Sequence, residues 1–262
     1  MAIYGILGDI HGNREALAAA LERLDDCGVE RLLCVGDLVG YNADGDDCVA
    51  LLRERAAQCI SGNHDLIGTG QLGFERCSNK AMHSLKRTRR TLGAPSASYL
   101  RSLPSHRVID DLFLLTHGGV RDVQQYMTKP RHFIQNADFL RRDFPGIRIC
   151  FYGHTHEQRV FEIDRIGYCD LESGATTLRR DREYFVNPGS IDASRKHGAK
   201  LAEFALFDTA SRRVEFHRVP YDDMATERKA EAEGYRIDRW RDLLYDVRRR
   251  VLGPRQVDTQ RA

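Results

Sequence analysis

Short apolar runs, each closed by glycine and polar residues, organise the first part of the chain. Residues 3–7, 31–35 and 57–60 are such runs, and a run of this length followed by a turn signal predicts a buried strand. Residues 13–24 and 45–55, which lie between these runs, carry apolar side chains at helical spacing. This alternation of strand and helix predicts an α/β sheet with right-handed crossovers.

Further along, the pattern shifts from alternation to mostly strands. Polar or amphipathic stretches at residues 75–92 and 131–142 predict two helices. The predicted strands are short runs bounded by turn residues, at 105–110, 112–116, 147–152, 159–163, 184–187, 202–207 and 213–219. Together the two patterns predict a mixed α/β fold for residues 1–220, a two-sheet β-sandwich with helices outside.

The charged segment 221–252 is predicted to add a C-terminal helix. Its apolar stripe, spaced as on one helix face, consists of Trp240, Leu243, Leu244, Val247 and Val251. We expect this helix to pack on the domain; binding a partner is the alternative, and a homo-oligomer through the stripe stays open. Residues 253–262 are expected to form a flexible tail.

Composition is that of an ordinary soluble globular protein. Of 262 residues 42% are hydrophobic and 30% charged, and the net charge of +2 gives no strong field for nucleic acid or a membrane surface. No run approaches the ~18 apolar residues of a membrane span, and no signal-peptide pattern opens the chain. The seven cysteines lack a Cys-x-x-Cys pair, which favours a reduced, cytoplasmic protein.

Five of the apolar runs end in the same kind of polar cluster. The clusters are Asp9 with His11, Asp37, Asn63 with His64, His117, and His154 with His156. If Asp9 and His11 continue their strand, they point to the same side. In α/β sheets the ligand crevice lies outside the carboxyl ends of the strands. Each cluster alone fits a hydrogen-bonded surface group, but five at five strand ends predict one common site.

The donor count indicates two metal ions. Oxygen and nitrogen ligands are offered by seven side chains, namely Asp9, His11, Asp37, Asn63, His117, His154 and His156. One ion seldom takes more than ~4 to 6 protein ligands of this kind, whereas two ions that share a carboxylate need about seven. Asp37 is the candidate bridge, since a carboxylate can hold two ions ~3.5 to 4 Å apart. The ligand types alone do not choose among Mn, Fe, Zn, Co and Ni; the ion that we expect is Mn.

These residues resemble the motif set of the calcineurin-like metallophosphoesterases. The motifs, in the family's order, are Asp9-x-His11, Gly36-Asp37, Gly62-Asn63-His64-Asp65, His117-Gly118 and Gly153-His154-Thr155-His156. The resemblance implies a two-sheet sandwich flanked by helices. It also implies the ligand sets: Asp9, His11 and His156 for one ion, Asn63, His117 and His154 for the other, with Asp37 between them.

By the same resemblance His64 stands where the family has its catalytic histidine. The expected reaction is in-line attack on phosphorus by a hydroxide that bridges the ions. His64 could protonate the leaving oxygen or stabilise phosphoryl charge, and Asp65 could orient its ring and raise its pKa. The alternative is a His64 that only hydrogen-bonds beside the ligands.

The residues after the second motif bear on the substrate. Phosphoprotein phosphatases of the family carry an arginine in Gly-Asp-x-x-Asp-Arg-Gly, whereas this chain has Gly36-Asp37-Leu38-Val39-Gly40-Tyr41. A bidentate clamp for a phosphomonoester is therefore missing there. Tyr41 could stack on a base or simply pack. Arg195 lies in a basic loop that could meet extra phosphates or be solvated.

The Gly-Asp-Leu-Val-Gly-Tyr form, with Asn187-Pro188-Gly189-Ser190, is similar to a prokaryotic branch of phosphodiesterases and diadenosine tetraphosphate hydrolases. We therefore expect hydrolysis of a small phosphodiester or nucleotide substrate. A phosphomonoesterase, phosphoprotein phosphatase or nuclease of the same fold is the second hypothesis, disfavoured by the missing arginine and the low net charge. A metal-dependent scaffold protein is the third; loss of a ligand or of His64 would favour it, and neither is lost.

Overall fold

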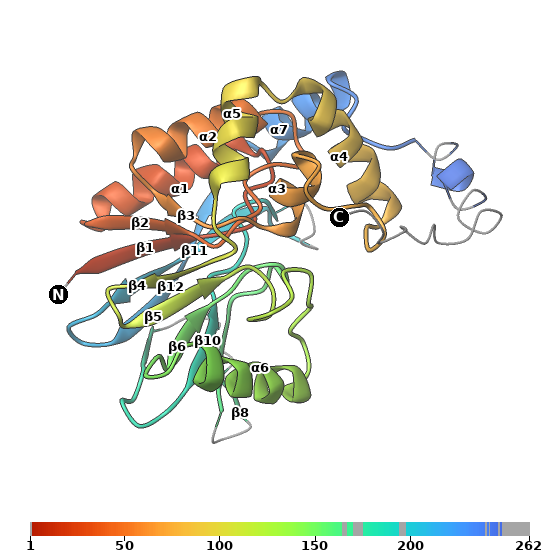
Figure 1. The fold of residues 1–262 in the computed structure, drawn as a ribbon. Helices are drawn as coiled ribbons and strands as arrows, with labels where there is room; N and C mark the ends of the chain where they lie inside the picture. The colour runs from red at the N-terminus through yellow and green to blue at the C-terminus, as the bar shows by residue number, and fades with distance from the viewer. Residues whose placement is uncertain are drawn as a thin grey trace.

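The computed structural model describes residues 2–163, 167–169, 175–193 and 198–238, together with positions 240, 242–245 and 247. Two mixed sheets pack face to face, and helices cover the outer face of each (Figure 1). Six strands form each sheet within the described residues. The predicted sandwich of two sheets flanked by helices is confirmed.

The first sheet has the order β3-β2-β1-β11-β12-β9. In chain order its strands are β1 (Ile3–Leu7), β2 (Arg31–Cys34), β3 (Gln58–Cys59), β9 (Ala175–Thr177), β11 (Leu201–Asp208) and β12 (Arg213–Pro220). β1, β2 and β3 are parallel, while β11 pairs antiparallel with both β1 and β12. Three carboxyl strand ends therefore meet at one edge of this sheet.

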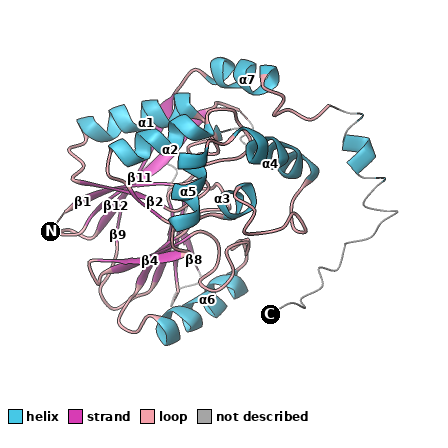
Figure 2. Cartoon of the chain, turned by 45° about the horizontal axis from the view of Figure 1, so that its top comes forward, coloured by secondary structure: helices cyan, strands magenta, loops and turns pink. Residues whose placement is uncertain are grey.

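Helices α1 (Arg14–Asp26), α2 (Gly45–Glu54) and α5 (Ala94–Ser102) share a hydrophobic core with the outer face of this sheet. α1 begins at Asn13, whose side chain accepts the N–H of Ala16 at 3.1 Å. Figure 2 shows α1 and α2 on one side of the sandwich and α6 on the other.

The second sheet has the order β4-β5-β6-β10-β7-β8. Its strands are β4 (His106–Ile109), β5 (Phe113–Thr116), β6 (Ile149–Phe151), β7 (Arg159–Glu162), β8 (Gly167–Cys169) and β10 (Tyr184–Asn187). β5, β6 and β10 are parallel to one another. Helix α6 (Pro130–Asp143) packs on the outer face through Phe133 and Leu140.

The inner faces of the two sheets form the central core. Tyr4 and Ile6 alternate along β1 and face Phe113 and Phe151 from the second sheet. The rings of Tyr4 and Phe113 meet edge to face at 5.2 Å. Each fully buried side chain of this size contributes about 1.5–3 kcal/mol of hydrophobic stabilisation, so the sheets are held firmly where their strand ends must meet.

Two helices that periodicity alone did not predict lie near the strand ends. α3 (Asn63–Gly68) starts directly after β3, and its first residues are polar, so it lacks an apolar repeat at its start. α5 contains a proline in its first turn. Proline is tolerated there because a backbone N–H at that position would have no acceptor within the helix. α4 (Asn79–Thr91) falls within the predicted stretch 75–92 and packs on α3.

The C-terminal segment is described in part. Helix α7 (Asp223–Ala232) packs on α1, where Thr226 Oγ1 donates to Asn13 Oδ1 at 3.0 Å. Farther on, the stripe residues that the structure describes are exposed: Trp240 (78%), Leu243, Leu244 and Val247. The division at residue 220 stays a prediction, and positions 248–262 lie outside the described residues.

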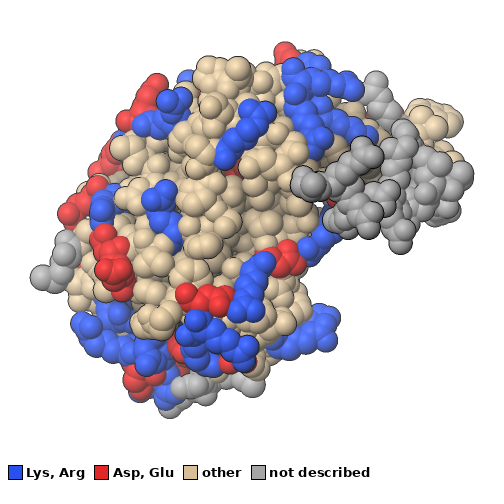
Figure 3. All heavy atoms as spheres, viewed as in Figure 1, with Lys and Arg blue, Asp and Glu red and all other residues tan. Residues whose placement is uncertain are grey.

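The described surface mixes both signs of charge. Figure 3 shows basic and acidic side chains interspersed, with basic groups gathered over α4, which carries Lys86, Arg87, Arg89 and Arg90. No helix in the described part of the chain combines the length and apolar character that crossing a membrane requires.

Candidate metal centre and its pocket

The predicted site residues follow strand ends of both sheets. Asp9, Asp37 and Asn63 follow β1, β2 and β3, while His117 and His154 follow β5 and β6. The sandwich brings these two sets of ends together: His117 Nδ1 lies 2.8 Å from the carbonyl of Val35 in the other sheet's loop. All seven predicted metal ligands are at most 5% exposed. They are called the metal cluster below: Asp9, His11, Asp37, Asn63, His117, His154 and His156.

Five residues of the metal cluster have left-handed backbone conformations, which set the directions of their side chains. The φ angles are positive for non-glycine residues at Asp9 (52°), His11 (53°), Asp37 (58°), His154 (68°) and His156 (62°). Such a conformation costs roughly 1–2 kcal/mol per residue, so the surrounding structure must impose it. β1 ends before these positions. The expectation that Asp9 and His11 point the same way because they continue a strand is therefore wrong; two left-handed turns bring them together instead.

Asp9, His11 and His156 form one group of donors. Nε2 of His156 lies 3.4 Å from Asp9 Oδ1 and 3.2 Å from Nε2 of His11. Ligand atoms of all three lie within 4.8 Å of one another. Asp9 is fixed by the backbone N–H of His154, which donates to its carboxylate at 3.0 Å.

Asp37, His117 and His154 form a second group with the same spacing. Asn63 belongs with it, since its Oδ1 lies 3.0 Å from His117 Nε2. Oδ2 of Asp37 lies 3.2 Å from Nε2 of His117 and 3.8 Å from Nε2 of His11, between the two groups. Oδ1 of Asp37 accepts the backbone N–H of His64 at 2.7 Å.

The electrostatics of the metal cluster call for positive charge. Burial alone would raise the pKa of Asp37, but His117, His64 and His11 outweigh it and hold that pKa well below its usual value. Burial lowers the pKa of His117, but Asp37 and Asp9 more than compensate and raise it to about 9. Buried carboxylates this close need a proton or a cation nearby. Two further contacts suit a cation: Nδ1 of His117 and of His11 faces a backbone carbonyl, which turns Nε2 toward Asp37.

His64 lies beside the metal cluster and lines the adjoining pocket. Its ring meets the rings of His11 and Tyr41 at centroid distances of 4.5 and 4.8 Å. Its Nδ1 edge rests on Gly40, where φ is +113° and an added Cβ would come within 2.3 Å. Only glycine fits both that conformation and that close approach.

Asp65 joins two loops of the site, and its expected role of orienting the ring of His64 stays a prediction. Its carboxylate accepts four backbone N–H groups, those of Asp37, Leu38, Val39 and Gly62, at 2.8–3.2 Å. Burial and the charge of Asp37 raise the pKa of Asp65 to about 7, although these N–H donors favour the carboxylate. Asp65 therefore ties the loop after β2 to the start of α3, and so places Asp37 and His64.

The turn at residues 187–190 supports the loops that carry Asp9 and His154. Asn187 Nδ2 donates to the carbonyl of Gly153 at 3.0 Å, and Ser190 Oγ donates to the carbonyl of Asp9 at 3.0 Å. Gly189 takes φ of +90° and donates its N–H to Asn187 Oδ1, closing the turn. The turn connects the loops that carry Asp9 and His154.

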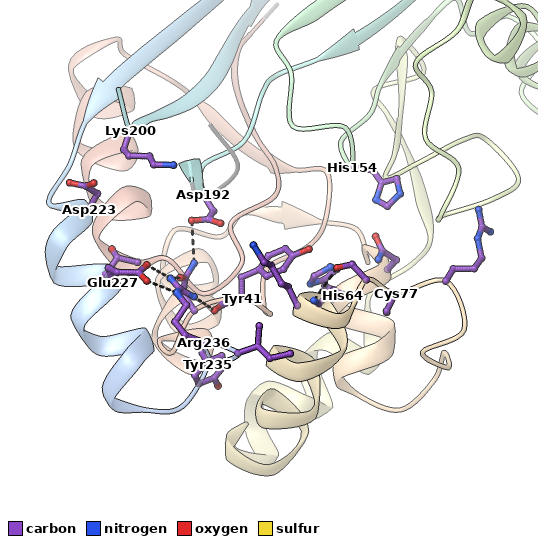
Figure 4. Close-up of a pocket in the computed structure, with 18 of the residues that line it drawn as sticks. Tyr41, His64, Cys77, His154, Asp192, Lys200, Asp223, Glu227, Tyr235 and Arg236 are labelled. Atoms are coloured by element: carbon purple, nitrogen blue, oxygen red, sulfur yellow. Dashed lines mark hydrogen bonds and ion pairs between the residues drawn. The ribbon is translucent and has the colours of Figure 1, made fainter. Parts of the chain in front are cut away.

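A pocket of about 1050 Å³ opens over Asn63, His64 and His154 (Figure 4). Tyr41, predicted as a substrate contact, lines it and packs its ring against His11 and His64. Arg195, the other predicted contact, lies outside the described residues.

Sequence reasoning missed several residues around this pocket. Tyr126 is 47% exposed, and its ring lies 4.0 Å from that of His154. Asn42 and Asp192 are buried and hydrogen-bonded to each other at 3.2 Å. Arg236 reaches Asn42 from the far end of the chain. None of these residues belongs to a sequence motif. The only sequence feature that could have indicated them is an aromatic or amide residue close to a strand-end cluster, and Arg236 lacks even that feature.

Comparison with known proteins finds a matching family. A sequence profile of the calcineurin-like phosphoesterase superfamily domain matches residues 1–212. An uncharacterised protein of Methanocaldococcus jannaschii is 26% identical over 226 residues, 84% of this chain and 88% of that protein.

Solved structures share the fold. A metallophosphoesterase from Sphaerobacter thermophilus is similar with a TM-score of 0.74 at 28% identity, over 92% of this chain and 97% of that one. A hypothetical protein from Pyrococcus horikoshii is similar with a TM-score of 0.68 at 19% identity, over 93% and 97% of the two chains.

Proposed function

Because the chain belongs to the calcineurin-like phosphoesterase superfamily, we propose that it hydrolyses small phosphodiesters or dinucleoside polyphosphates with two divalent metal ions, Mn²⁺ foremost. The observation that carries the proposal is the metal cluster itself. Two groups of buried donors lie on either side of Asp37 Oδ2, and the adjoining pocket is lined by Asn63, His64 and His154.

The donor set fits two ions. Asp9, His11 and His156 would hold one, and Asn63, His117 and His154 the other, with Asp37 between them. When bound, such ions polarise the phosphate oxygens and lower the pKa of a water molecule. The protein's own contribution is to fix these ligands before binding, through the left-handed turns and the N–H donors to Asp9 and Asp37.

His64 would protonate the leaving-group oxygen. It lines the pocket at the edge of the metal cluster, and its position is set by Gly40, Tyr41 and its own N–H bond to Asp37. The Nδ1 edge of His64 faces Gly40, and we assign the proton transfer to Nε2. No nucleophilic serine or cysteine is required.

Two features support a phosphodiester or nucleotide substrate. The loop after Asp37 lacks the arginine that would clamp a monoester dianion and offers the Tyr41 ring instead. The pocket, at about 1050 Å³, has the size of sites for nucleotide-sized ligands and leaves room well beyond one phosphate group.

The test compares three substrates after Mn²⁺ loading: bis(nitrophenyl) phosphate, nitrophenyl phosphate and diadenosine tetraphosphate. We expect turnover of the diester or the tetraphosphate to exceed that of the monoester. Asp37→Asn should lower it on the order of 10³-fold, because several kcal/mol of electrostatic stabilisation depend on the ions.

Ion content after dialysis is measured in parallel for both proteins. Preference for the monoester would overturn the substrate assignment. A wild-type protein that binds ions but hydrolyses none of the three would overturn the proposed hydrolysis and favour a metal-dependent scaffold.

A further inference from the structure

The pocket has a wall built by chain beyond the matched family domain. The family profile ends at residue 212, yet several residues that line the pocket come later. We call this part, residues 221–237, the C-terminal wall; its pocket-lining members are Tyr221, Asp223, Thr226, Glu227, Tyr235, Arg236 and Ile237. Figure 4 shows Glu227 and Arg236 extending from this wall toward Tyr41.

α7 anchors the first part of the wall to α1. Thr226 Oγ1 contacts Asn13 and Glu15 at 3.0 Å. Lys229 Nζ pairs with Glu15 at 2.7 Å and also contacts Asp44 at the start of α2. The helix is thus fixed to the layer that carries the loops after β1 and β2.

A tight turn then ties the wall to α4. Gly234, with φ of +69°, ends α7. Its carbonyl lies 3.1 Å from Nε2 of His83, and the buried Tyr235 shares a hydrogen bond of 2.8 Å with Thr91. Arg236 therefore leaves the turn from a fixed position.

Arg236 connects this wall to the loop that covers the metal cluster. Its guanidinium group is paired with Glu227, whose Oε1 lies 2.7 Å from Nε. It donates from Nη1 to the carbonyl of Tyr41 at 2.7 Å and from Nη2 to Asn42 Oδ1 at 2.9 Å (Figure 4). Arginine suits this task because its planar fork holds several donors in one geometry.

The two residues that Arg236 holds contact the metal cluster directly. Asn42 donates its backbone N–H to the carbonyl of His11 at 3.0 Å and its side-chain amide to the same carbonyl at 3.2 Å. Tyr41 has φ of +24°, an uncommon conformation for an aromatic residue, and its ring lies against both His11 and His64. A turn of this kind needs outside contacts to keep it in place.

We propose that Arg236 is a positioning residue that fixes the Tyr41–Asn42 turn, so that the C-terminal wall sets the preference of the pocket for phosphoesters with a bulky organic group. This inference rests on the proposed function. Tyr41 is the group that would contact the substrate, and Arg236, braced by Glu227, keeps its ring at the pocket side of His64.

The experiment measures selectivity in the Mn²⁺-loaded full chain. Selectivity is the ratio of kcat/KM for diadenosine tetraphosphate to kcat/KM for methyl nitrophenyl phosphate. We expect Arg236→Gln to lower it about tenfold, mainly through KM for the tetraphosphate, and Arg236→Lys to restore part of it. Arg55→Gln is the matched control, because Arg55 forms an exposed pair with Asp25 at the far end of α1.

A double-mutant cycle tests whether Arg236 acts through Tyr41. In a Tyr41→Ala background, Arg236→Gln should change selectivity less than about twofold, since the ring it positions is gone. Equal effects of Arg236→Gln in both backgrounds, or unchanged selectivity in the single variant, would overturn the proposal. If Arg236→Gln fails to fold, Glu227→Gln, which removes the brace and keeps Arg236, takes its place in the cycle.

Hydrogen exchange gives a readout that is independent of turnover. Amides of residues 38–43 should exchange at least about fivefold faster in Arg236→Gln than in Arg55→Gln, because the Asn42 N–H bond to His11 loosens. If the wild type hydrolyses nothing but this acceleration appears, the proposed function fails while the positioning role stands. If exchange is unchanged, the positioning role fails whatever the enzyme does.

Discussion

The bottom and the side of the pocket are built in opposite ways. At the bottom, the metal cluster is buried, five of its members have left-handed backbones, and its contacts are largely to backbone groups. At the side, the C-terminal wall uses long side chains in partly exposed ion pairs, such as Arg236 (29% exposed) with Glu227 (52%). We therefore expect the metal cluster to tolerate few substitutions and the C-terminal wall to tolerate more.

This difference teaches where chemistry and selectivity can reside. The position of a ligand that backbone geometry fixes can be changed only by disturbing the fold, so the reacting groups are kept in one arrangement. Partly exposed ion pairs are each worth only about 0–1 kcal/mol, so they can be exchanged at little cost to stability. Substitutions at the bottom should therefore have large effects and those at the wall small ones.

The largest effect is expected at His64. His64→Gln removes the proton donor but keeps the backbone N–H that bonds to Asp37. We expect kcat to fall about 10²–10⁴-fold while ion content after dialysis is unchanged. A variant that retains most of the kcat for a substrate with a poor leaving group would show that another residue supplies the proton.

Next is Asp65→Asn, whose effect should be on folding. The amide can accept through one oxygen only, so about two of the four N–H groups lose their acceptor. We expect a loss of roughly 3 kcal/mol in the free energy of unfolding, measured in urea. Asp122→Asn is the control. The carboxylate of Asp122 is exposed and pairs with Arg76, so this variant should change the free energy of unfolding by less than about 1 kcal/mol.

Gly40→Ala should displace the ring of His64 without preventing the ions from binding. The new Cβ would collide with His64 Nδ1, and φ of +113° is strained for alanine. We expect stability to fall by about 1–3 kcal/mol and kcat to fall with it, while ion binding persists. Gly28→Ala provides the comparison, since that glycine also has positive φ but nothing lies within 4 Å of its added Cβ.

The smallest effect concerns the wall and depends on pH. Arg236 lowers the pKa of Glu227 below its ordinary value, with burial opposing and Lys200 assisting. The pair therefore contributes stability above the pKa of Glu227 in the unfolded chain, and that contribution is lost as pH falls through the lower folded pKa. Urea midpoints of wild type and Glu227→Gln should differ slightly at neutral pH and converge as the pH falls below the folded-state pKa of Glu227. A gap that widens on acidification would contradict the assignment.

The sequence was most informative about the bottom of the pocket. Asp9, Asp37, Asn63, His117 and His154 could be placed at one edge because each follows an apolar run, and strand ends converge in such sheets. The strand 184–187 and the helix around residues 131–142 were also predicted nearly as observed, since their patterns are uninterrupted. Local pattern suffices wherever the burial of one face dictates the element.

The remainder depends on contacts that no local pattern encodes. The carboxylate of Asp65 accepts backbone N–H groups from both Asp37 and Gly62, which lie on two separate loops. Arg236 meets Tyr41 across 195 positions of the chain, through a segment with no motif. The five strand ends are also divided between two sheets. This division depends on which strands pair with each other, and the residues of a single strand do not specify its partner.

The division of the metal cluster between two sheets has a consequence for assembly. Asp9, Asp37 and Asn63 are synthesised well before His117, His154 and His156, and neither set alone completes the two donor groups assigned to the proposed ions, although His11, Asp37 and His64 of the early half form a further group. Ions would therefore act as late cross-links that join the early and late halves of the sandwich, much as a disulfide joins distant parts of a secreted chain. The amount of ion retained by a purified sample would then report the fraction of molecules in which both sheets have docked correctly.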